Sequence, residues 1–244
     1  MPHSDGMFRN HATGEPMRKP ISKALINGYM AVSTSNISDA LDRLGIPCEP
    51  TQIGALWSSC KKIVGPAMTL TLAPLERSHK EITTVVGTLQ AIMDALPGDV
   101  LVIDVGGRMD LNTFGGVAGA TTQHYGLAGV VCDGVARDID EYKTLDLPVF
   151  GKGFIHQSVR GRVGYVSHNT EAKLGANIVR PGDLIVGDEN GVVVVPHEQI
   201  EGVLKIARFV KDTEDGVIAA IRAGGDPIEV HQKVKYDDML KRTS

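Results

Sequence analysis

The sequence predicts a mixed α/β fold, a sandwich in which helices cover a central sheet. Apolar runs typical of buried strands are concentrated in the middle of the 244-residue chain, at 100–104, 126–133 and 184–195. Segments with a helical spacing of apolar residues lie toward both ends. The chain has no G-x-G-x-x-G segment after a strand and no P-loop segment, so we do not expect a doubly wound nucleotide-binding sheet.

The first half of the chain begins with a polar stretch and then alternates helices with strands. Residues 1–20 contain Gly and Pro and lack an apolar signal core, so we expect a flexible arm. The second helix is expected to be capped by Ser35 and ended by Gly45. A turn at 64–67 is expected before an alternating strand at 68–72. The apolar spacing predicts helices at 22–30, 35–44 and 80–95.

Two short segments of the second half, 97–104 and 181–188, resemble each other. Each has a Pro-Gly-Asp turn followed by an apolar strand that ends in Asp, so we expect both to enter the core in a similar way. Asn190-Gly191 predicts a hairpin with the next strand. A long helix is expected over 197–223, stopped by Gly224-Gly225. The resulting organisation is an arm at 1–20, one domain over 21–225 and a charged extension over the surface at 226–244.

Composition excludes several classes of function. The chain is 42% hydrophobic and 22% charged, as in ordinary globular proteins. A net charge of −4, the lack of a basic block and 5% aromatic residues argue against a nucleic-acid partner. No apolar run reaches 18 residues, so no membrane partner is expected. The three cysteines and eight histidines lack metal-ligand spacing, which favours reduced thiols in a cytoplasmic protein.

The apolar strand within 126–133 ends at a glycine turn and leads to an Arg–Asp pair. Arg137 and Asp138 open an expected helix at 138–145. A guanidinium can hold a carboxylate through two hydrogen bonds, and an Asp carboxylate is a hard oxygen ligand that suits Mg²⁺ or Mn²⁺. The pair therefore indicates a site for a small oxo acid and a divalent cation. For the dipeptide alone, the alternative is an exposed ion pair at a helix start.

A glycine-rich stretch at 105–119 is the second candidate element. If the residues Gly115, Gly116, Val117 and Ala118 begin a helix, their free amides form an anion site that could bind a carboxylate opposite Arg137. The alternative, equally weighted from spacing alone, is a tight turn whose glycines pack against a neighbouring strand.

Six pieces of the chain, in this order and spacing, resemble the RraA-like family over roughly residues 30–220. That family includes the class II 4-hydroxy-4-methyl-2-oxoglutarate/4-carboxy-4-hydroxy-2-oxoadipate aldolases, which also decarboxylate oxaloacetate; older descriptions call its members demethylmenaquinone methyltransferases. The resemblance implies an RraA-like α/β/β/α sandwich of the swivelling β/β/α type with a long C-terminal helix. The matching pieces are 36–41, 63–67, 98–104, 126–138, 148–151 and 182–196.

The resemblance also implies roles for individual residues. Arg137 would bind the pyruvyl carboxylate, and Asp138 would be the direct protein ligand of a divalent cation, Mg²⁺ or alternatively Mn²⁺. The amides of 115–118 would bind substrate, and Gly134 would form a strained turn before the pair. Glu214 corresponds, by its position on the C-terminal helix, to a Glu that reaches a metal-bound water in the neighbouring subunit's site. A homotrimer or a hexamer is therefore expected.

One position departs from the aldolases of the family. They carry an acidic residue 21 positions before the Arg, where it holds a metal-bound water, and this chain has Gly116 there. Asp110 is near in sequence and is a candidate replacement. Loss of such a supporting carboxylate can cost on the order of 10–100-fold in affinity or rate.

The implied function is metal-dependent cleavage of 4-hydroxy-2-oxo acids to pyruvate, with oxaloacetate decarboxylation at the same site. The substrate is a small 2-oxo acid, and no Schiff-base lysine is needed. The alternative is a non-catalytic regulatory protein like those that bind and inhibit RNase E. Arg108 in the glycine loop is a further candidate. A basic cluster of His156, Arg160 and Arg162 could attract a distal carboxylate, although a solvated loop is the alternative.

Overall fold

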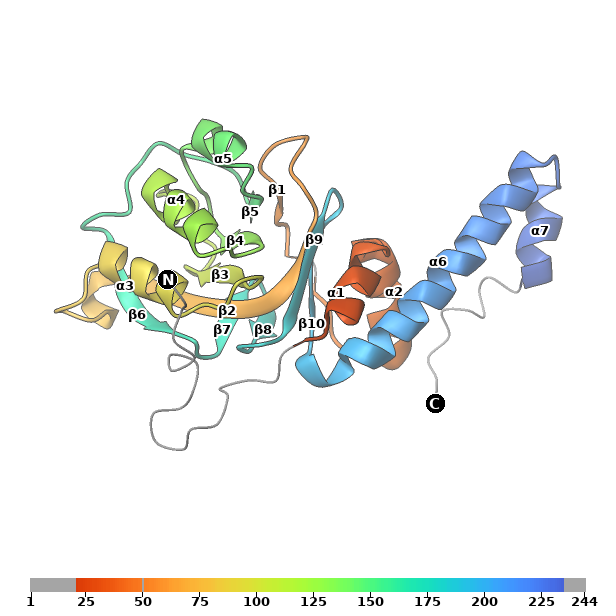
Figure 1. The fold of residues 1–244 in the computed structure, drawn as a ribbon, viewed down its shortest axis with the longest axis horizontal. Coiled ribbons are helices and arrows are strands. Elements are labelled where there is room, and N and C mark those ends of the chain that lie inside the picture. The colour runs from red at the N-terminus through yellow and green to blue at the C-terminus, as the bar shows by residue number, and fades with distance from the viewer. Residues whose placement is uncertain (1–20, 50, 235–244) are drawn as a thin grey trace.

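The computed structural model describes residues 21–49 and 51–234, so the expected arm at 1–20 and the last residues of the expected extension, 235–244, lie outside the described residues. Helices cover a curved mixed sheet (Figure 1), as predicted for the α/β sandwich. The helices are α1 (Lys23–Met30), α2 (Thr34–Leu44), α3 (Thr84–Met93), α4 (Gly116–His124), α5 (Ile139–Leu145), α6 (Ile200–Arg222) and α7 (Pro227–Val234), with 3₁₀ turns at Leu75–Arg77 and His197–Gln199.

The main sheet has the strand order β1-β5-β4-β3-β2-β9-β10, and β6 also pairs with β2; β7 and β8 form a separate pair. The strands are β1 (Gly54–Ala55), β2 (Ile63–Pro74), β3 (Val100–Asp104), β4 (Gly129–Asp133), β5 (Val149–Gly151), β6 (Val163–His168), β7 (Ala172–Leu174), β8 (Asn177–Val179), β9 (Leu184–Asp188) and β10 (Gly191–Val195).

Strand β2 joins the two halves of the sheet. Residues 63–66 pair antiparallel with β9, 67–71 pair parallel with β3, and 70–74 pair antiparallel with β6. The predicted turn at 64–67 is therefore wrong, because the strand runs straight through it. Glycine is needed at position 65 of this strand because a Cβ there would overlap the carbonyl oxygen of Gly98. Turn composition here reflects a close approach of two backbones.

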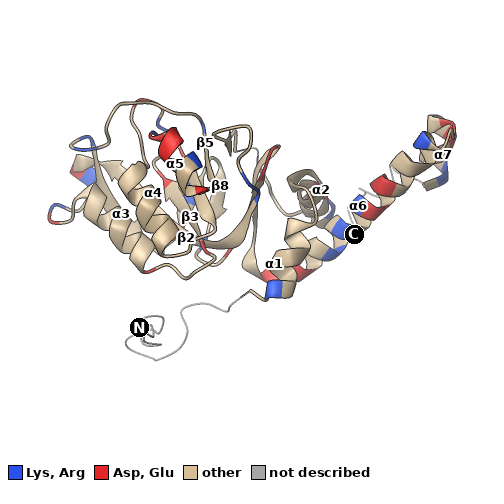
Figure 2. Ribbon diagram, turned by 45° about the horizontal axis from the view of Figure 1, so that its top comes forward, with Lys and Arg blue, Asp and Glu red and all other residues tan. Residues whose placement is uncertain are grey.

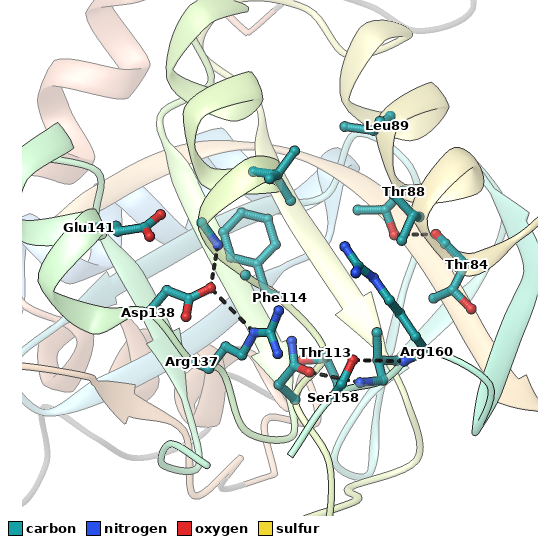
Figure 3. A pocket seen from close by; sticks show the side chains of 17 residues that line it. Thr84, Thr88, Leu89, Thr113, Phe114, Arg137, Asp138, Glu141, Ser158 and Arg160 are labelled. Atoms are coloured by element: carbon teal, nitrogen blue, oxygen red, sulfur yellow. Dashed lines mark hydrogen bonds and ion pairs between the residues drawn. The ribbon is translucent and has the colours of Figure 1, made fainter. Parts of the chain in front are cut away.

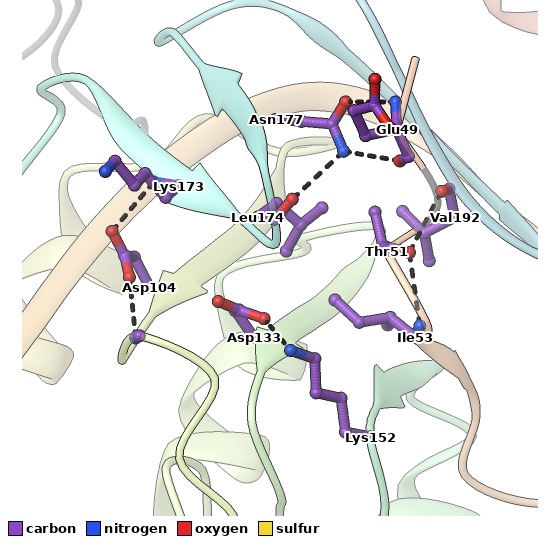
Figure 4. A network of polar contacts seen from close by, with 11 residues as sticks. Glu49, Thr51, Ile53, Asp104, Asp133, Lys152, Lys173, Leu174, Asn177 and Val192 are labelled. Carbon is purple, nitrogen blue, oxygen red and sulfur yellow. Dashed lines mark hydrogen bonds and ion pairs between the residues drawn. The ribbon is translucent and has the colours of Figure 1, made fainter.

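The strands β2, β3, β4 and β5 form the parallel part of the sheet, with α3, α4 and α5 as crossovers. The carboxyl ends of neighbouring parallel strands meet at one edge, so the segments after β3 and β4 are brought together there. A polar network holds this edge (Figure 4). Asp133 is nearly buried and ion-paired to Lys152 at 2.6 Å, while Asp104 accepts hydrogen bonds of 2.9 Å from the amides of Gly106 and Lys173.

Apolar side chains pack on both faces of the sheet. One cluster lies between the parallel strands and the helices α3, α4 and α5, and a second joins β9 and β10 to α1, α2 and α6. A third cluster, which includes Val102, Val131 and Phe150, lies inside the curve of the sheet. The parallel strands are therefore covered on both sides, which explains their continuous apolar runs.

The expected hairpin is confirmed, since Asp188 of β9 pairs with Gly191 of β10. The expected helix cap at Ser35 is wrong. Ser33 is the N-cap of α2, and it exchanges hydrogen bonds with Asn36 in a capping box. Capping side chains can occupy several adjacent positions in a Ser- and Thr-rich stretch, so the spacing alone did not fix which one is used.

The C-terminal helix α6 extends beyond the body of the sandwich, and α7 folds back beside it after the glycine pair at 224–225 (Figure 1). The expected extension thus begins as a helix. Charged residues of both signs lie along α6 and α7 (Figure 2). Within residues 21–49 and 51–234, no helix is both long and apolar enough to cross a bilayer.

A buried hydroxyl links α1 to the start of α6. Tyr29 is fully buried, and its hydroxyl donates a 2.8 Å hydrogen bond to the carbonyl of Ile200. The change Tyr29→Phe should lower the free energy of unfolding by about 1–3 kcal/mol, because it leaves that carbonyl without its donor. Urea denaturation measures this. Tyr125→Phe is the control, since the half-buried Tyr125 has no hydroxyl hydrogen bond to the described residues. Equal losses in both variants would contradict the assignment.

Candidate active site

A pocket lies at the edge where the segments after β3 and β4 meet (Figure 3). Its walls are the first turns of α3, the loop between β3 and α4, the start of α4, the Arg137–Asp138 pair and a loop before β6. The lining residues are 84–85, 88–89, 112–118, 137–138, 141 and 158–160. The structure therefore places Gly115, Gly116, Val117, Ala118, Arg137 and Asp138 in one cavity.

Asp138 has a left-handed backbone, with φ 61° and ψ 42°, and is the N-cap of α5. This conformation costs a residue with a Cβ roughly 1–2 kcal/mol, although Asp tolerates it better than most. Strain of this kind clusters at functional sites. The strain was expected at Gly134, but Gly134 does not have a positive φ. Gly134 is needed for space instead, because a Cβ there would lie 2.8 Å from the carbonyl oxygen of Arg108.

The carboxylate of Asp138 is held against the N-terminus of α4. Its Oδ2 accepts a 2.8 Å hydrogen bond from the amide of Gly116 and lies 3.3 Å from Nε of Arg137. Helix α4 begins at Gly116, so the amides of its first turn have no acceptor within the helix. Gly115 allows this approach, since a Cβ there would lie 3.1 Å from Asp138 Oδ2. The arrangement is an anion-binding helix start with a carboxylate and a guanidinium beside it.

Arg137 carries a donor that the described residues leave unsatisfied. Its Nε is shielded from solvent and has no well-aligned hydrogen-bond acceptor in the described part of the chain, although the side chain is 31% exposed. Buried polar atoms are usually hydrogen-bonded, and exceptions mark binding sites. Because the Arg137 side chain is part-exposed and lines the pocket, a small carboxylate there can pair with its guanidinium.

The wall opposite Asp138 contains Asn112, which the sequence analysis did not single out, and Arg160 of the expected basic cluster. Asn112 is buried and holds the loop before β6. Its backbone N–H donates to the carbonyl of Gln157, and its side-chain Oδ1 accepts from the backbone N–H of Val159, both at 2.8 Å. Figure 3 shows Arg160 pointing from this loop into the pocket. Within the described residues Arg160 forms no ion pair. Of the expected basic cluster, Arg160 is therefore the member that lines the pocket, because the fold brings its loop opposite Asp138.

The other basic candidates lie outside the pocket lining. Arg108 is bound to Asp110 by hydrogen bonds of 2.9 and 2.6 Å, and the side chain of Asp110 is 64% exposed. Arg162 donates to the carbonyl of Ser158, and His156 is exposed. Asp110 is therefore tied to a neighbouring loop residue rather than placed beside Asp138.

Tyr142 of α5 is hydrogen-bonded to the loop before α4. Its ring is buried and its hydroxyl donates 2.9 Å to the carbonyl of Phe114. Burial raises the pKa of Tyr142, and the Cys132 thiol and the negative charges of Asp138 and Glu141 raise this pKa further. The hydroxyl therefore stays protonated and keeps α5 and the loop in register.

Glu214 lies on α6 and does not line this pocket. Its Oε2 accepts a 2.7 Å hydrogen bond from the side-chain amide of Asn36 in α2. Burial raises the pKa of the nearby Asp39, and the negative charge of Glu214 adds to that rise. Within one chain, the structure thus separates Glu214 from Arg137 and Asp138.

The donor set of the pocket fits a hydrated hard cation. The described residues contain no group of three or more His, Cys, Asp or Glu side chains that could hold a metal ion. The pocket offers the carboxylates of Asp138 and Glu141. Mg²⁺ keeps several waters and is commonly bound through one or two carboxylates, so this small oxygen set is compatible with it.

The fold and the pocket define an RraA-like protein. The RraA-like family (Aldolase/RraA) matches residues 34–194, and the chain belongs to this family. It is 36% identical over 184 residues to a protein of Halalkalibacterium halodurans named "Putative 4-hydroxy-4-methyl-2-oxoglutarate aldolase", a match that covers 75% of this chain and 81% of that protein.

The chain is also similar to a longer protein and to a protein of known structure. The Legionella pneumophila protein DlpA is 28% identical over 214 residues, which are 87% of this chain but only 34% of DlpA, so the chain spans about a third of that relative. The crystal structure of Streptomyces coelicolor RraAS2, described as an unusual member of the RNase ES inhibitor RraA family, superposes with a TM-score of 0.71 at 26% identity. It covers 81% of this chain and 97% of RraAS2, which confirms the fold expected from the sequence.

Proposed function

We propose that this protein is a divalent-metal-dependent aldolase that cleaves 4-hydroxy-2-oxo acids of the 4-hydroxy-4-methyl-2-oxoglutarate type to pyruvate, and that it also decarboxylates oxaloacetate. One observation carries the proposal: the Arg137 guanidinium, the carboxylate of Asp138, whose backbone is left-handed, and the N-terminus of α4 converge in one pocket. The names of its relatives, putative 4-hydroxy-4-methyl-2-oxoglutarate aldolases, support the reaction class.

The residues of the pocket supply binding and charge stabilisation. Arg137 and the amides of the first turn of α4 that follow Gly116 would hold the carboxylate of the 2-oxo acid, because the Gly116 amide is bound by Asp138. Asp138 would hold the cation, which supplies Lewis-acid stabilisation of negative charge when bound. In the cleavage step the C4 hydroxyl loses its proton and becomes a carbonyl as the C3–C4 bond breaks. The electron pair of that bond stays on the pyruvyl fragment as an enolate, which then takes up a proton at C3. Arg137 and the helix amides favour this step because they already face the developing negative charge.

The opposite wall suits a substrate with a second carboxylate. Arg160 brings a positive charge to the far side of the pocket from Asp138, and the Ser158 hydroxyl lies beside it. The hydroxyls of Thr84 and Thr88 line the same wall but donate to the carbonyls of Val163 and Thr84. Val85 and Leu89 add apolar surface that a small alkyl group could contact. This combination favours dicarboxylates over simple monocarboxylates.

A second candidate function is a regulatory protein that binds an RNase E-type enzyme. The likeness to RraAS2 favours it. The pocket does not, because a purely docking protein has no need of a strained carboxylate or a buried, unsatisfied guanidinium nitrogen. The assay below separates the two functions.

Pyruvate release is the direct test of the proposed function. The wild-type protein with Mg²⁺ or Mn²⁺ should release pyruvate from oxaloacetate and from 4-hydroxy-4-methyl-2-oxoglutarate, above the rate of the cation alone. Chelation should stop the release and added cation should restore it. Asp138→Asn should remove turnover while leaving the melting temperature unchanged, because Asn also tolerates the left-handed backbone. Wild-type turnover in this variant would refute the role of Asp138.

Arg137→Lys tests the carboxylate grip. An ammonium cannot reproduce a two-pronged guanidinium contact, so KM should rise and kcat should fall. The expected loss in kcat/KM is about 10-fold or more, in line with a charged hydrogen bond of roughly 1.5–3 kcal/mol. Steady-state kinetics on oxaloacetate measure it. Lys143→Arg, a change on the exposed end of α5, is the control and should keep wild-type kinetics. Unchanged kinetics in Arg137→Lys would remove Arg137 from the site.

We further propose that the protein works as a homotrimer or hexamer in which Glu214 of one subunit completes the site of another. The support is that Glu214 lies away from its own chain's pocket on a helix that extends beyond the body. Two inactive variants, Asp138→Asn and Glu214→Gln, should then regain part of their activity when co-expressed, because mixed oligomers contain some sites with both residues intact. Sedimentation should show the oligomer. Activity in a stable monomer, or no recovery in mixed oligomers, would contradict this arrangement.

A further inference from the structure

Glu141 occupies the space that a side chain at residue 116 would fill. Gly116 is the buried first residue of α4. A Cβ built on it would lie 2.5 Å from the carboxyl carbon of Glu141, 3.1 Å from Oε1 and closer still to Oε2. Gly116 does not have a positive φ, so its backbone does not require glycine. A side chain at residue 116 would therefore displace the end of the exposed Glu141 side chain from its present position.

Two carboxylates from one turn of the chain therefore converge on Gly116. Asp138 Oδ2 accepts the Gly116 amide at 2.8 Å, and the amide of Glu141 donates 3.1 Å to the carbonyl of Asp138. Both side chains line the pocket, and Figure 3 shows the two carboxylates beside each other. Neighbouring negative charges repel, and Arg137 lies against Asp138 alone. The pair is balanced when a cation shares the pocket.

We infer that Glu141 is a positioning residue of the cation site, which with Asp138 holds a hydrated divalent cation, and that the lack of a side chain at Gly116 lets this carboxylate lie where it does. The inference rests on the proposed function, since it assigns a second protein group to the same site. Glu141, rather than Asp110, would thus supply the supporting carboxylate, because Asp110 is held by Arg108 outside the pocket lining. It also implies that the chain has moved a supporting carboxylate from α4 to α5.

Mn²⁺ binding tests the inference without relying on turnover. Titration followed by the electron paramagnetic resonance signal of free Mn²⁺ gives Kd directly. Glu141→Gln should weaken binding by about 10-fold or more, the usual effect of losing a supporting group. Asp140→Asn is the matched control: it removes the same charge from the adjacent residue of α5, which does not line the pocket. It should bind Mn²⁺ as the wild type does.

A double-mutant cycle tests the steric part of the inference. Gly116→Ala should weaken Mn²⁺ binding because its methyl group displaces the Glu141 carboxylate. In a Glu141→Ala background, the same Gly116→Ala change should cost nothing further, since the carboxylate is already gone. Losses that simply add would show that the two residues act independently and would overturn the inference. Circular dichroism and melting temperature verify that each variant is folded.

The outcomes separate this inference from the proposed function. Wild-type Kd in Glu141→Gln, together with lost binding in Asp138→Asn, overturns the role of Glu141 and leaves the proposed function standing. A wild-type protein that neither binds Mn²⁺ nor releases pyruvate overturns the proposed function and the inference with it. Weaker binding in Glu141→Gln and in Gly116→Ala, with no additivity between the Gly116 and Glu141 changes, supports the inference whatever the preferred substrate is.

Discussion

The parallel, in-register pairing of β3 with β4 is the constraint on which the pocket depends. Asp104 and Asp133 lie opposite each other at the ends of these strands, so the chain leaves both strands at the same level. The two segments that follow then have to pack together, and they become the loop before α4 and the Arg137–Asp138 turn. The ion pair of the buried Asp133 with Lys152 stabilises this edge. Removing either partner would leave an uncompensated charge at this edge of the sheet.

Close approach of backbone segments is the second requirement of the site. Gly115, Gly116 and Gly134 each lie where a Cβ would meet a group from another segment of the chain, which is the Asp138–Glu141 turn for the first two and Arg108 for Gly134. The glycines therefore matter less for conformational freedom than for the distance at which α4 can approach the turn after β4. The result is that a helix N-terminus, a guanidinium and two carboxylates share one small volume.

Asp138 shows how the fold supports a strained residue. Its left-handed backbone aims the carboxylate at the Gly116 amide, while Tyr142, one turn further along α5, bonds to the carbonyl of Phe114. Buried packing around Tyr142 stabilises this turn and offsets the cost of the strain. The charge balance of the site is then set locally: Arg137 lies against Asp138, and the second carboxylate, Glu141, lies one turn along α5.

The sequence by itself determined the fold class, the buried parallel strands, the β9–β10 hairpin and the Arg137–Asp138 pair, because these features are written in local patterns of apolar residues, turns and motifs. It left open whether 115–118 begins a helix or forms a tight turn, and the structure shows α4 beginning at Gly116. It could not decide that 64–67 continues a strand, since only the carbonyl of Gly98 explains Gly65. Nor could it place Arg160 and Asn112 in the pocket, or Arg108 with Asp110 outside its lining. Gly116 shows the difference most clearly: the sequence records a missing acid at that position, whereas the tertiary structure shows a carboxylate there, supplied by Glu141 from a neighbouring helix. Side chains distant in sequence meet only when strand order and helix packing are set, and that information is not local.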